Sequence, residues 1–227
     1  MARLIEPIQA ETGQSSEGAP ERGAAVTGAP SLPVPLVLRM TGAARMEAAQ
    51  FFEFCRQNDF YRIERAASGE VIIMPPAEPP SSERNSELVI QLGIWAKQDG
   101  TGVPYESSAG FTLSTGAVRS PDASWIRKDR LAALTPKQRT RFWAICPDFV
   151  AEIRSATDRL PPLQAKMEEY RDNGAQLGWL IDPKARQIYV YRPGEAVQRL
   201  DNPATVSGDP VLPGFVLDAA AVFAASF

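Results

Sequence analysis

The chain has 227 residues, 24 basic and 27 acidic side chains, a formal net charge of -3, two cysteines and no histidine. This composition excludes a Ser-His-Asp triad, a Cys-His pair and a Cys/His zinc site, and Cys55 and Cys146 form no CxxC pattern. Any catalysis must therefore use carboxylates, lysine, arginine, hydroxyl groups or a bound hard cation. No apolar run approaches the roughly 18 residues that cross a bilayer, so we expect a reduced, cytoplasmic protein without a membrane segment.

The first part of the chain predicts a leader followed by a helix and a hairpin. Residues 1–35 are rich in proline, glycine and serine and contain no aromatic residue, which favours disorder. Residues 36–227 are expected to form one domain. It begins with a helix capped by Thr41, continues with strands over 60–64 and 70–74, and then enters a proline-rich loop over 75–82.

The rest of the domain alternates helices with strands. A helix is predicted from Glu83, where Leu88, Leu92 and Trp95 form an apolar stripe that Gly100 ends. A second helix is predicted over 163–173. The pattern of β-branched and aromatic residues between turn residues predicts the strands, which are 105–113, 122–126, 149–155, 177–181 and 187–191. The order from Glu83 onward is therefore α, β, β, β, α, β, β.

Two carboxylates stand at unusual places in these strands. Asp122 begins one strand, and Glu152 interrupts the otherwise apolar segment from Phe149 to Ile153. The two-residue period of a strand places Glu152 and Arg154 on the same face. A carboxylate among aliphatic neighbours needs a cation, a basic partner or a cleft. Paired carboxylates on adjacent strands suit a hard divalent cation such as Mg²⁺ or Mn²⁺, with a nearby basic side chain to stabilise the transition state.

Nine segments in this order resemble one known family. They are Tyr61–Glu64, Gly69–Pro76, Arg84–Glu87, Gly110–Leu113, Arg119–Trp125, Cys146–Glu152, Leu163–Tyr170, Leu177–Pro183 and Val190–Gly194. With these segments the chain resembles, over residues 40–223, the Uma-two-like restriction endonucleases of the PD-(D/E)XK nuclease superfamily. The resemblance implies an α/β fold with a restriction-endonuclease-like core, in which helices flank a mixed central β-sheet in the order αβββαβ. This order agrees with the one predicted from the sequence pattern.

The resemblance also implies a function and a set of site residues. The expected function is Mg²⁺-dependent hydrolysis of DNA phosphodiester bonds, with Asp122 and Glu152 as metal ligands and Glu87 as an auxiliary acid. The chain departs from the superfamily at Arg154, which stands where the pattern has lysine. Because arginine does not release its proton at ordinary pH, Arg154 can act only as an electrostatic clamp. Lys166, on the following helix, is the expected substitute for the lysine.

Each of these residues also has a purely structural interpretation. Asp122 is suited to accept hydrogen bonds from nearby backbone amides. Glu152 is suited to a structural ion pair with Arg154 or Lys166. Glu87 and Lys166 are suited to a helix surface that faces water. Asp148, in a second Pro-Asp pair, is excluded as the partner of Glu152, since four residues of one strand separate them by about 13 Å.

The segment from Arg119 to Arg141 is rich in basic residues and contains Trp125. It is suited to follow a DNA backbone, or to form a solvated helix whose Leu131 and Leu134 pack inward. Two functional alternatives remain. One is a catalytically inactive module that binds nucleic acid or another partner through the retained nuclease fold. The other is a protein that is active only as an oligomer, such as a homodimer.

Overall fold

The computed structural model describes residues 35–40 and 45–224, which belong to a compact unit spanning Pro33–Phe227. The predicted leader, apart from its last residue, and the predicted cap Thr41 lie outside the described residues. None of the helices in the described part of the chain is both long and apolar enough to cross a membrane.

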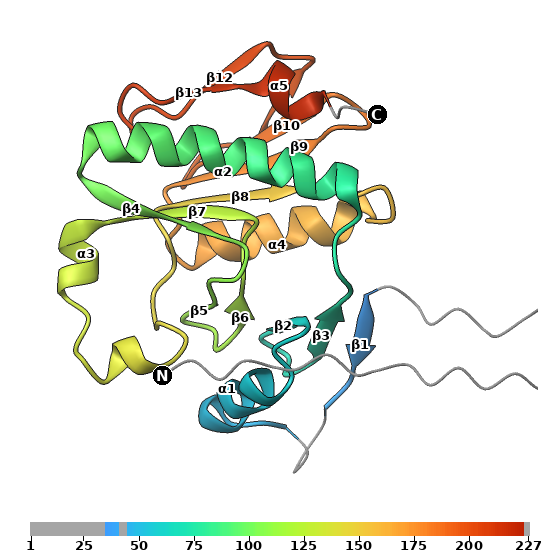
Figure 1. The fold of residues 1–227 in the computed structure, drawn as a ribbon, viewed down its shortest axis with the longest axis vertical. Coiled ribbons are helices and arrows are strands. Elements are labelled where there is room, and N and C mark those ends of the chain that lie inside the picture. Colours follow the sequence, from blue (N-terminus) through green and yellow to red (C-terminus); the bar gives the residue numbers. More distant parts are fainter. Residues whose placement is uncertain (1–34, 41–44, 225–227) are drawn as a thin grey trace, which may run out of the picture. The chain divides into compact units, whose positions relative to one another are not determined.

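Helices separate runs of one to five strands along the described chain (Figure 1). The α-helices are α1 (Ala48–Gln57), α2 (Pro79–Asp99), α3 (Lys128–Ala132), α4 (Leu160–Asp172) and α5 (Ala219–Phe223). The strands are β1 (Leu36–Leu38), β2 (Arg62–Arg65), β3 (Val71–Met74), β4 (Gly102–Glu106), β5 (Phe111–Thr112), β6 (Val118–Arg119), β7 (Ala123–Arg127), β8 (Phe149–Ile153), β9 (Leu177–Asp182), β10 (Gln187–Tyr191), β11 (Gln198–Asp201), β12 (Thr205–Ser207) and β13 (Val216–Asp218). A short 3-10 helix covers Gln138–Thr140.

A six-stranded mixed sheet forms the centre of the fold, with the strand order β11-β10-β9-β8-β7-β4. Strands β8 and β9 are parallel and are connected by α4, whereas the other neighbours in this sheet are antiparallel. The elements α2, β4, β7, β8, α4 and β9 occur in the predicted αβββαβ order. Strands β5 and β6 are inserted after β4, and α3 and the short 3-10 helix are inserted after β7. The predicted fold class is thereby confirmed.

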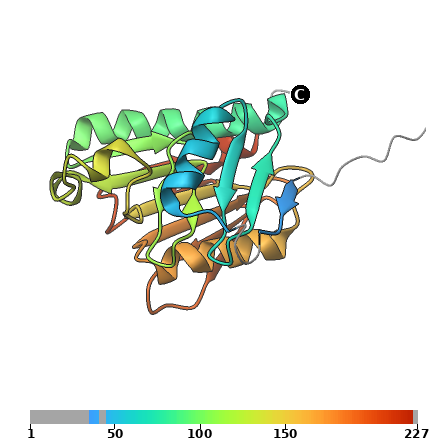
Figure 2. The same cartoon turned by 90° about the horizontal axis from the view of Figure 1, so that it is seen from below.

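Helices α2 and α4 cover opposite faces of this sheet (Figure 2 shows the sheet from a second direction). Along β8, Phe149, Ala151 and Ile153 pack in one core cluster with α2, as strand alternation predicts. Val150, on the other face, packs in a second cluster with Met167 of α4. Glu152 therefore lies on the α4 side of the sheet.

A five-stranded sheet with the order β1-β3-β2-β6-β5 adjoins this core. Its strand β2 has two different faces. Ile63 packs with Phe51 of α1 in a small apolar cluster, whereas Arg62 and Glu64 point away from it toward other polar groups. The residues Ser120–Asp122 lead directly from β6 of this sheet into β7 of the six-stranded sheet, so the two sheets meet there.

Several predicted bounds differ from the structure by a few residues; helix α4, for example, begins at Leu160 instead of Leu163. The larger differences concern α2 and the first strand after it. Helix α2 begins at Pro79 instead of Glu83, because proline fits the first turn of a helix, where its missing N–H has no partner to lose. The strand predicted over 105–113 is two strands, β4 and β5, joined by a turn. In this turn Gly110 packs so closely on Phe142 that an added Cβ would lie 2.4 Å from the ring. The short strands β1, β6, β11, β12 and β13 were not predicted.

Candidate functional site

Charged side chains from both sheets and from α4 converge where the sheets meet. Strand β2 contributes Arg62 and Glu64, and β6 ends at Arg119. Asp122 directly precedes β7, and Glu152 lies in β8. Helix α4 adds Lys166, Glu169 and Tyr170, whose spacings of three and four residues place them on one helix face.

The acidic and basic groups of this cluster alternate in space. Arg119 binds Glu169 at 2.6 Å and Glu64 at 3.2 Å. Lys166 Nζ lies 2.9 Å from Glu64 Oε1 and 2.7 Å from Glu152 Oε1. Arg62 lies 3.9 Å from Glu152 Oε2 and 2.7 Å from Asp122 Oδ1. We call these residues the charge cluster; in spatial order they are Glu169, Arg119, Glu64, Lys166, Glu152, Arg62 and Asp122.

Glu152 is almost fully buried, with 4% of its side chain exposed. Its Oε1 accepts a hydrogen bond of 3.0 Å from the Tyr170 hydroxyl and also contacts Lys166. Burial raises the pKa of Glu152 to about 7, because removal from water and the nearby carboxylates Asp122 and Glu64 outweigh the attraction of Lys166 and Arg62. Glu152 is therefore a carboxyl group that binds or releases a proton near neutral pH.

Glu64 is equally buried but has the opposite electrostatic balance. The backbone N–H of Ser120 donates to its Oε1 at 3.0 Å, and Lys166 and Arg119 contact its two oxygens. Burial alone would raise the pKa of Glu64, but Lys166, Arg62 and Arg119 outweigh it and lower the pKa to about 2. Glu64 is thus a permanent anion that holds Lys166 and Arg119 in place.

Asp122 connects the cluster to the end of β8. Its Oδ2 accepts a hydrogen bond of 2.8 Å from the backbone N–H of Ile153, and its Oδ1 accepts one of 2.7 Å from Arg62. The first contact comes from a backbone N–H of another strand, whereas the structural interpretation of Asp122 expected donors nearby in the sequence. It also fixes the carboxylate beside Glu152, the residue that precedes Ile153.

Comparisons with known proteins agree with this architecture. Residues 48–220 match the family model described as "Uma2: Putative restriction endonuclease". The chain belongs to this family. A solved structure, "a putative nuclease belonging to DUF820" from Anabaena variabilis ATCC 29413, superposes with a TM-score of 0.61 and 23% sequence identity, over 71% of this chain and 89% of that chain. At this identity the superposition shows the shared fold. No curated protein matches the chain.

Within this Uma2 chain, the structure brings together three of the five predicted site residues. Asp122 and Glu152 share Arg62 as a partner, and Lys166 leans back over Glu152 as predicted. Arg62, Glu64 and Arg119 belong to the same cluster but were not predicted as site residues. Two signals were present in the sequence: Arg62, Glu64 and Arg119 lie in segments that carry the family resemblance, and the alternation Arg62-Ile63-Glu64 places two charges on one face of a short strand.

The other two predicted residues make separate contacts. Arg154 binds Asp182 at 2.7 Å and donates to the backbone carbonyl of Asp158 at 3.1 Å. Glu87 accepts a hydrogen bond from Gln91 at 2.8 Å. Among the contacts found in the described residues, neither side chain touches Asp122, Glu152 or Lys166. The roles predicted for Arg154 and Glu87 stay predictions.

The oxygen ligands present fit a hard divalent cation of the kind expected for this family. Arg62, itself a cation, bridges Asp122 Oδ1 and Glu152 Oε2, so these two oxygens already face one positive group. The described residues contain no cluster of three or more acidic or thiol side chains that could hold a metal. A cation would therefore take two carboxylate ligands and complete its shell with water and substrate oxygens, as Mg²⁺ commonly does.

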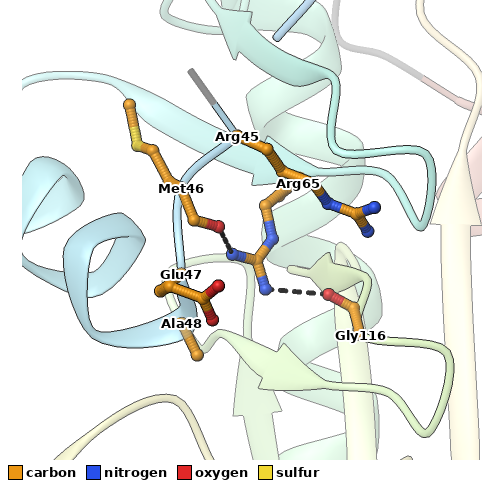
Figure 3. Close-up of a pocket in the computed structure, with 6 residues that line it drawn as sticks. All are labelled: Arg45, Met46, Glu47, Ala48, Arg65 and Gly116. Carbon is orange, nitrogen blue, oxygen red and sulfur yellow. Dashed lines mark hydrogen bonds between the residues drawn. The ribbon is translucent and has the colours of Figure 1, made fainter. Parts of the chain in front are cut away.

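A hollow lies beside α1, on the face of β2 opposite to the charge cluster. Its volume is about 390 Å³, and Figure 3 shows its lining residues Arg45, Met46, Glu47, Ala48, Arg65 and Gly116. Arg65 donates to the backbone carbonyls of Met46 and Gly116, each at 2.9 Å. These bonds tie α1 to the turn before β6, which makes Arg65 a structural residue.

Proposed function

We propose that this protein is a nuclease that hydrolyses DNA phosphodiester bonds with a divalent cation, Mg²⁺ or Mn²⁺, held by Asp122 and Glu152. The observation that carries the proposal is the pair of carboxylates that come from different strands and share one cationic partner, Arg62. Lys166 stands 2.7 Å from the second carboxylate. Membership of a family described as restriction endonucleases supports the same reaction class.

The residues of the cluster have separate roles in this proposal. A bound divalent cation would lower the pKa of an attacking water and stabilise the charge that develops on the phosphate. Lys166 would position that water or stabilise the transition state, and Glu64 would hold the ammonium group of Lys166 in place. Tyr170 would orient Glu152 through its hydroxyl hydrogen bond. None of these roles requires histidine.

The test is cleavage of a panel of DNA substrates with Mg²⁺ or Mn²⁺ by the wild type and by Asp122→Asn, Glu152→Gln and Lys166→Met. Cleavage should depend on the cation and should fall at least about 100-fold in each variant. Asp148→Asn is the matched control, because Asp148 also follows a proline and also pairs with an arginine, Arg130 at 2.9 Å, but lies outside the charge cluster. Circular dichroism checks that each variant is folded. Full activity of folded Asp122→Asn and Glu152→Gln would refute the proposal.

A second candidate is a DNA-binding module without turnover. The observation that favours it is that each carboxylate of the charge cluster is paired with one of the chain's own cations. The exposed basic residues of the segment 119–141 would bind the backbone of DNA; they are Arg127, Lys128, Lys137, Arg139 and Arg141. Leu134 of the same segment is buried, so the basic surface and the packed interior coexist. Salt-sensitive DNA binding without any nicking under Mg²⁺ or Mn²⁺ would favour this candidate.

A further inference from the structure

Arg62 occupies an unusual place in the charge cluster. Its Nη1 lies 2.7 Å from Asp122 Oδ1, while its Nη2 lies 3.9 Å from Glu152 Oε2 and 3.7 Å from Glu64 Oε1. One guanidinium group thus faces three carboxylates. Two of these are the carboxylates of the proposed metal site.

Its hydrogen bonds are incomplete in this position. Nη1 donates to Asp122 and Nη2 donates to the backbone carbonyl of Ser120. The Nε of Arg62 is buried and has no hydrogen-bond partner among the described residues. A buried donor without a hydrogen-bond partner costs free energy, so this conformation of Arg62 is less stable than a fully hydrogen-bonded one would be.

Arg62 is also the cation of the cluster that can most easily leave. Its side chain is 28% exposed, compared with 11% for Lys166 and 10% for Arg119. Lys166 and Arg119 each bridge two carboxylates at 3.2 Å or less, whereas only one of the carboxylate contacts of Arg62 is that short. Arg62 can therefore turn toward solvent while the other two cations stay in place.

We propose that Arg62 is a built-in competitor of the divalent cation: its guanidinium fills the place between Asp122 and Glu152, and a cation binds there only when Arg62 moves out. This inference rests on the metal site of the proposed function, but not on cleavage itself. Two positive groups cannot share the same pair of carboxylate oxygens without strong repulsion. The side chain of Arg62 therefore sets the concentration of cation at which the site fills.

The test is Mn²⁺ affinity, measured on the full chain by isothermal titration calorimetry and by the electron paramagnetic resonance signal of free Mn²⁺. Arg62→Gln removes the competing charge and should bind Mn²⁺ about tenfold or more tightly than the wild type. Arg62→Lys keeps a positive charge but has a side chain too short to bridge both carboxylates. Its affinity for Mn²⁺ should therefore lie between those of the wild type and Arg62→Gln. The gain should disappear in the double variant Arg62→Gln with Asp122→Asn, which localises it to this site.

Arg130→Gln is the matched control. Arg130 also pairs with a buried aspartate, Asp148, and its side chain is 35% exposed, but it lies outside the charge cluster. It should bind Mn²⁺ as the wild type does. If Arg62→Gln does not fold, as judged by circular dichroism, Arg62→Lys carries the comparison. Folded Arg62 variants that bind Mn²⁺ no more tightly than the wild type would overturn the inference.

The two proposals fail in different ways. If the wild type cleaves DNA and needs Asp122, but the Arg62 variants gain no Mn²⁺ affinity, competition is refuted and the nuclease proposal stands. If Arg62→Gln gains affinity through Asp122 and no variant cleaves DNA, competition stands and the nuclease proposal fails.

Discussion

The raised pKa of Glu152 predicts an unusual pH dependence of stability in the metal-free protein. The groups that face this carboxyl are Lys166, Arg62, Asp122, Glu64 and the Tyr170 hydroxyl, and burial is the largest influence on it. Together they raise the pKa of Glu152 from 4.5 to about 7. Between these two pH values the folded protein therefore keeps a proton on Glu152 that the unfolded chain has already released.

The sign and size of the effect follow from this difference. Because the folded state binds the extra proton, the free energy of unfolding falls as the pH rises through this window. A shift of this size corresponds to about 3 kcal/mol, since one pKa unit corresponds to roughly 1.4 kcal/mol. Only 4% of the side chain is exposed, so solvent screening reduces the value little. The loss is complete once the pH is well above 7.

The measurement is urea unfolding followed by tryptophan fluorescence between pH 4.5 and 8.5, in EDTA, for the wild type and Glu152→Gln. Glutamine does not titrate, so the variant should lack this loss of stability. As the pH rises from 4.5 to 8.5, the free energy of unfolding of the variant should increase by about 3 kcal/mol relative to that of the wild type. Glu87→Gln, which removes a carboxyl group outside the charge cluster, is measured in parallel as the control. Parallel curves for the wild type and Glu152→Gln would refute the argument.

Two further changes test the cluster and the core. Glu64→Gln should lower the free energy of unfolding at pH 7 by about 3 kcal/mol in urea denaturation, because it deprives the largely buried side chains of Lys166 and Arg119 of an anion. Glu53→Gln, in an exposed pair with Arg56, should change the free energy of unfolding little. Gly102→Ala should lower the melting temperature, because an added Cβ would lie 2.2 Å from the Trp125 ring. Gly93→Ala should instead raise the free energy of unfolding by roughly 0.5–1 kcal/mol, because Gly93 lies inside α2 with open space around it. Equal shifts of the melting temperature in the two variants would contradict this reasoning.

Periodicity within single elements predicted which face of β8 each side chain takes, and the family resemblance pointed to Lys166. Alternation along β8 correctly separated Val150 from its apolar neighbours on the other face, and the position of Lys166 in α4 predicted its approach to Glu152. These inferences hold because α4 follows β8 directly and must pack back on the sheet.

Contacts between distant segments could not be predicted in this way. The pairing of Arg154 with Asp182 joins two parallel strands, and nothing near Arg154 in the sequence identifies that partner. Arg62 and Glu64 reach the cluster because β2 pairs with β6, whose chain then crosses into β7. Strand β6 has only two residues, too few for any period to be visible.

The charges of the cluster imply that a proton and the proposed metal ion would compete for the same place. Four carboxylates face three cations, which leaves one negative charge in a largely buried site. A proton on Glu152 removes that charge, in agreement with its raised pKa. A divalent cation that replaces Arg62 removes it as well, because two positive charges enter as one leaves. Metal binding by this route should therefore release the proton from Glu152 and leave the cluster neutral.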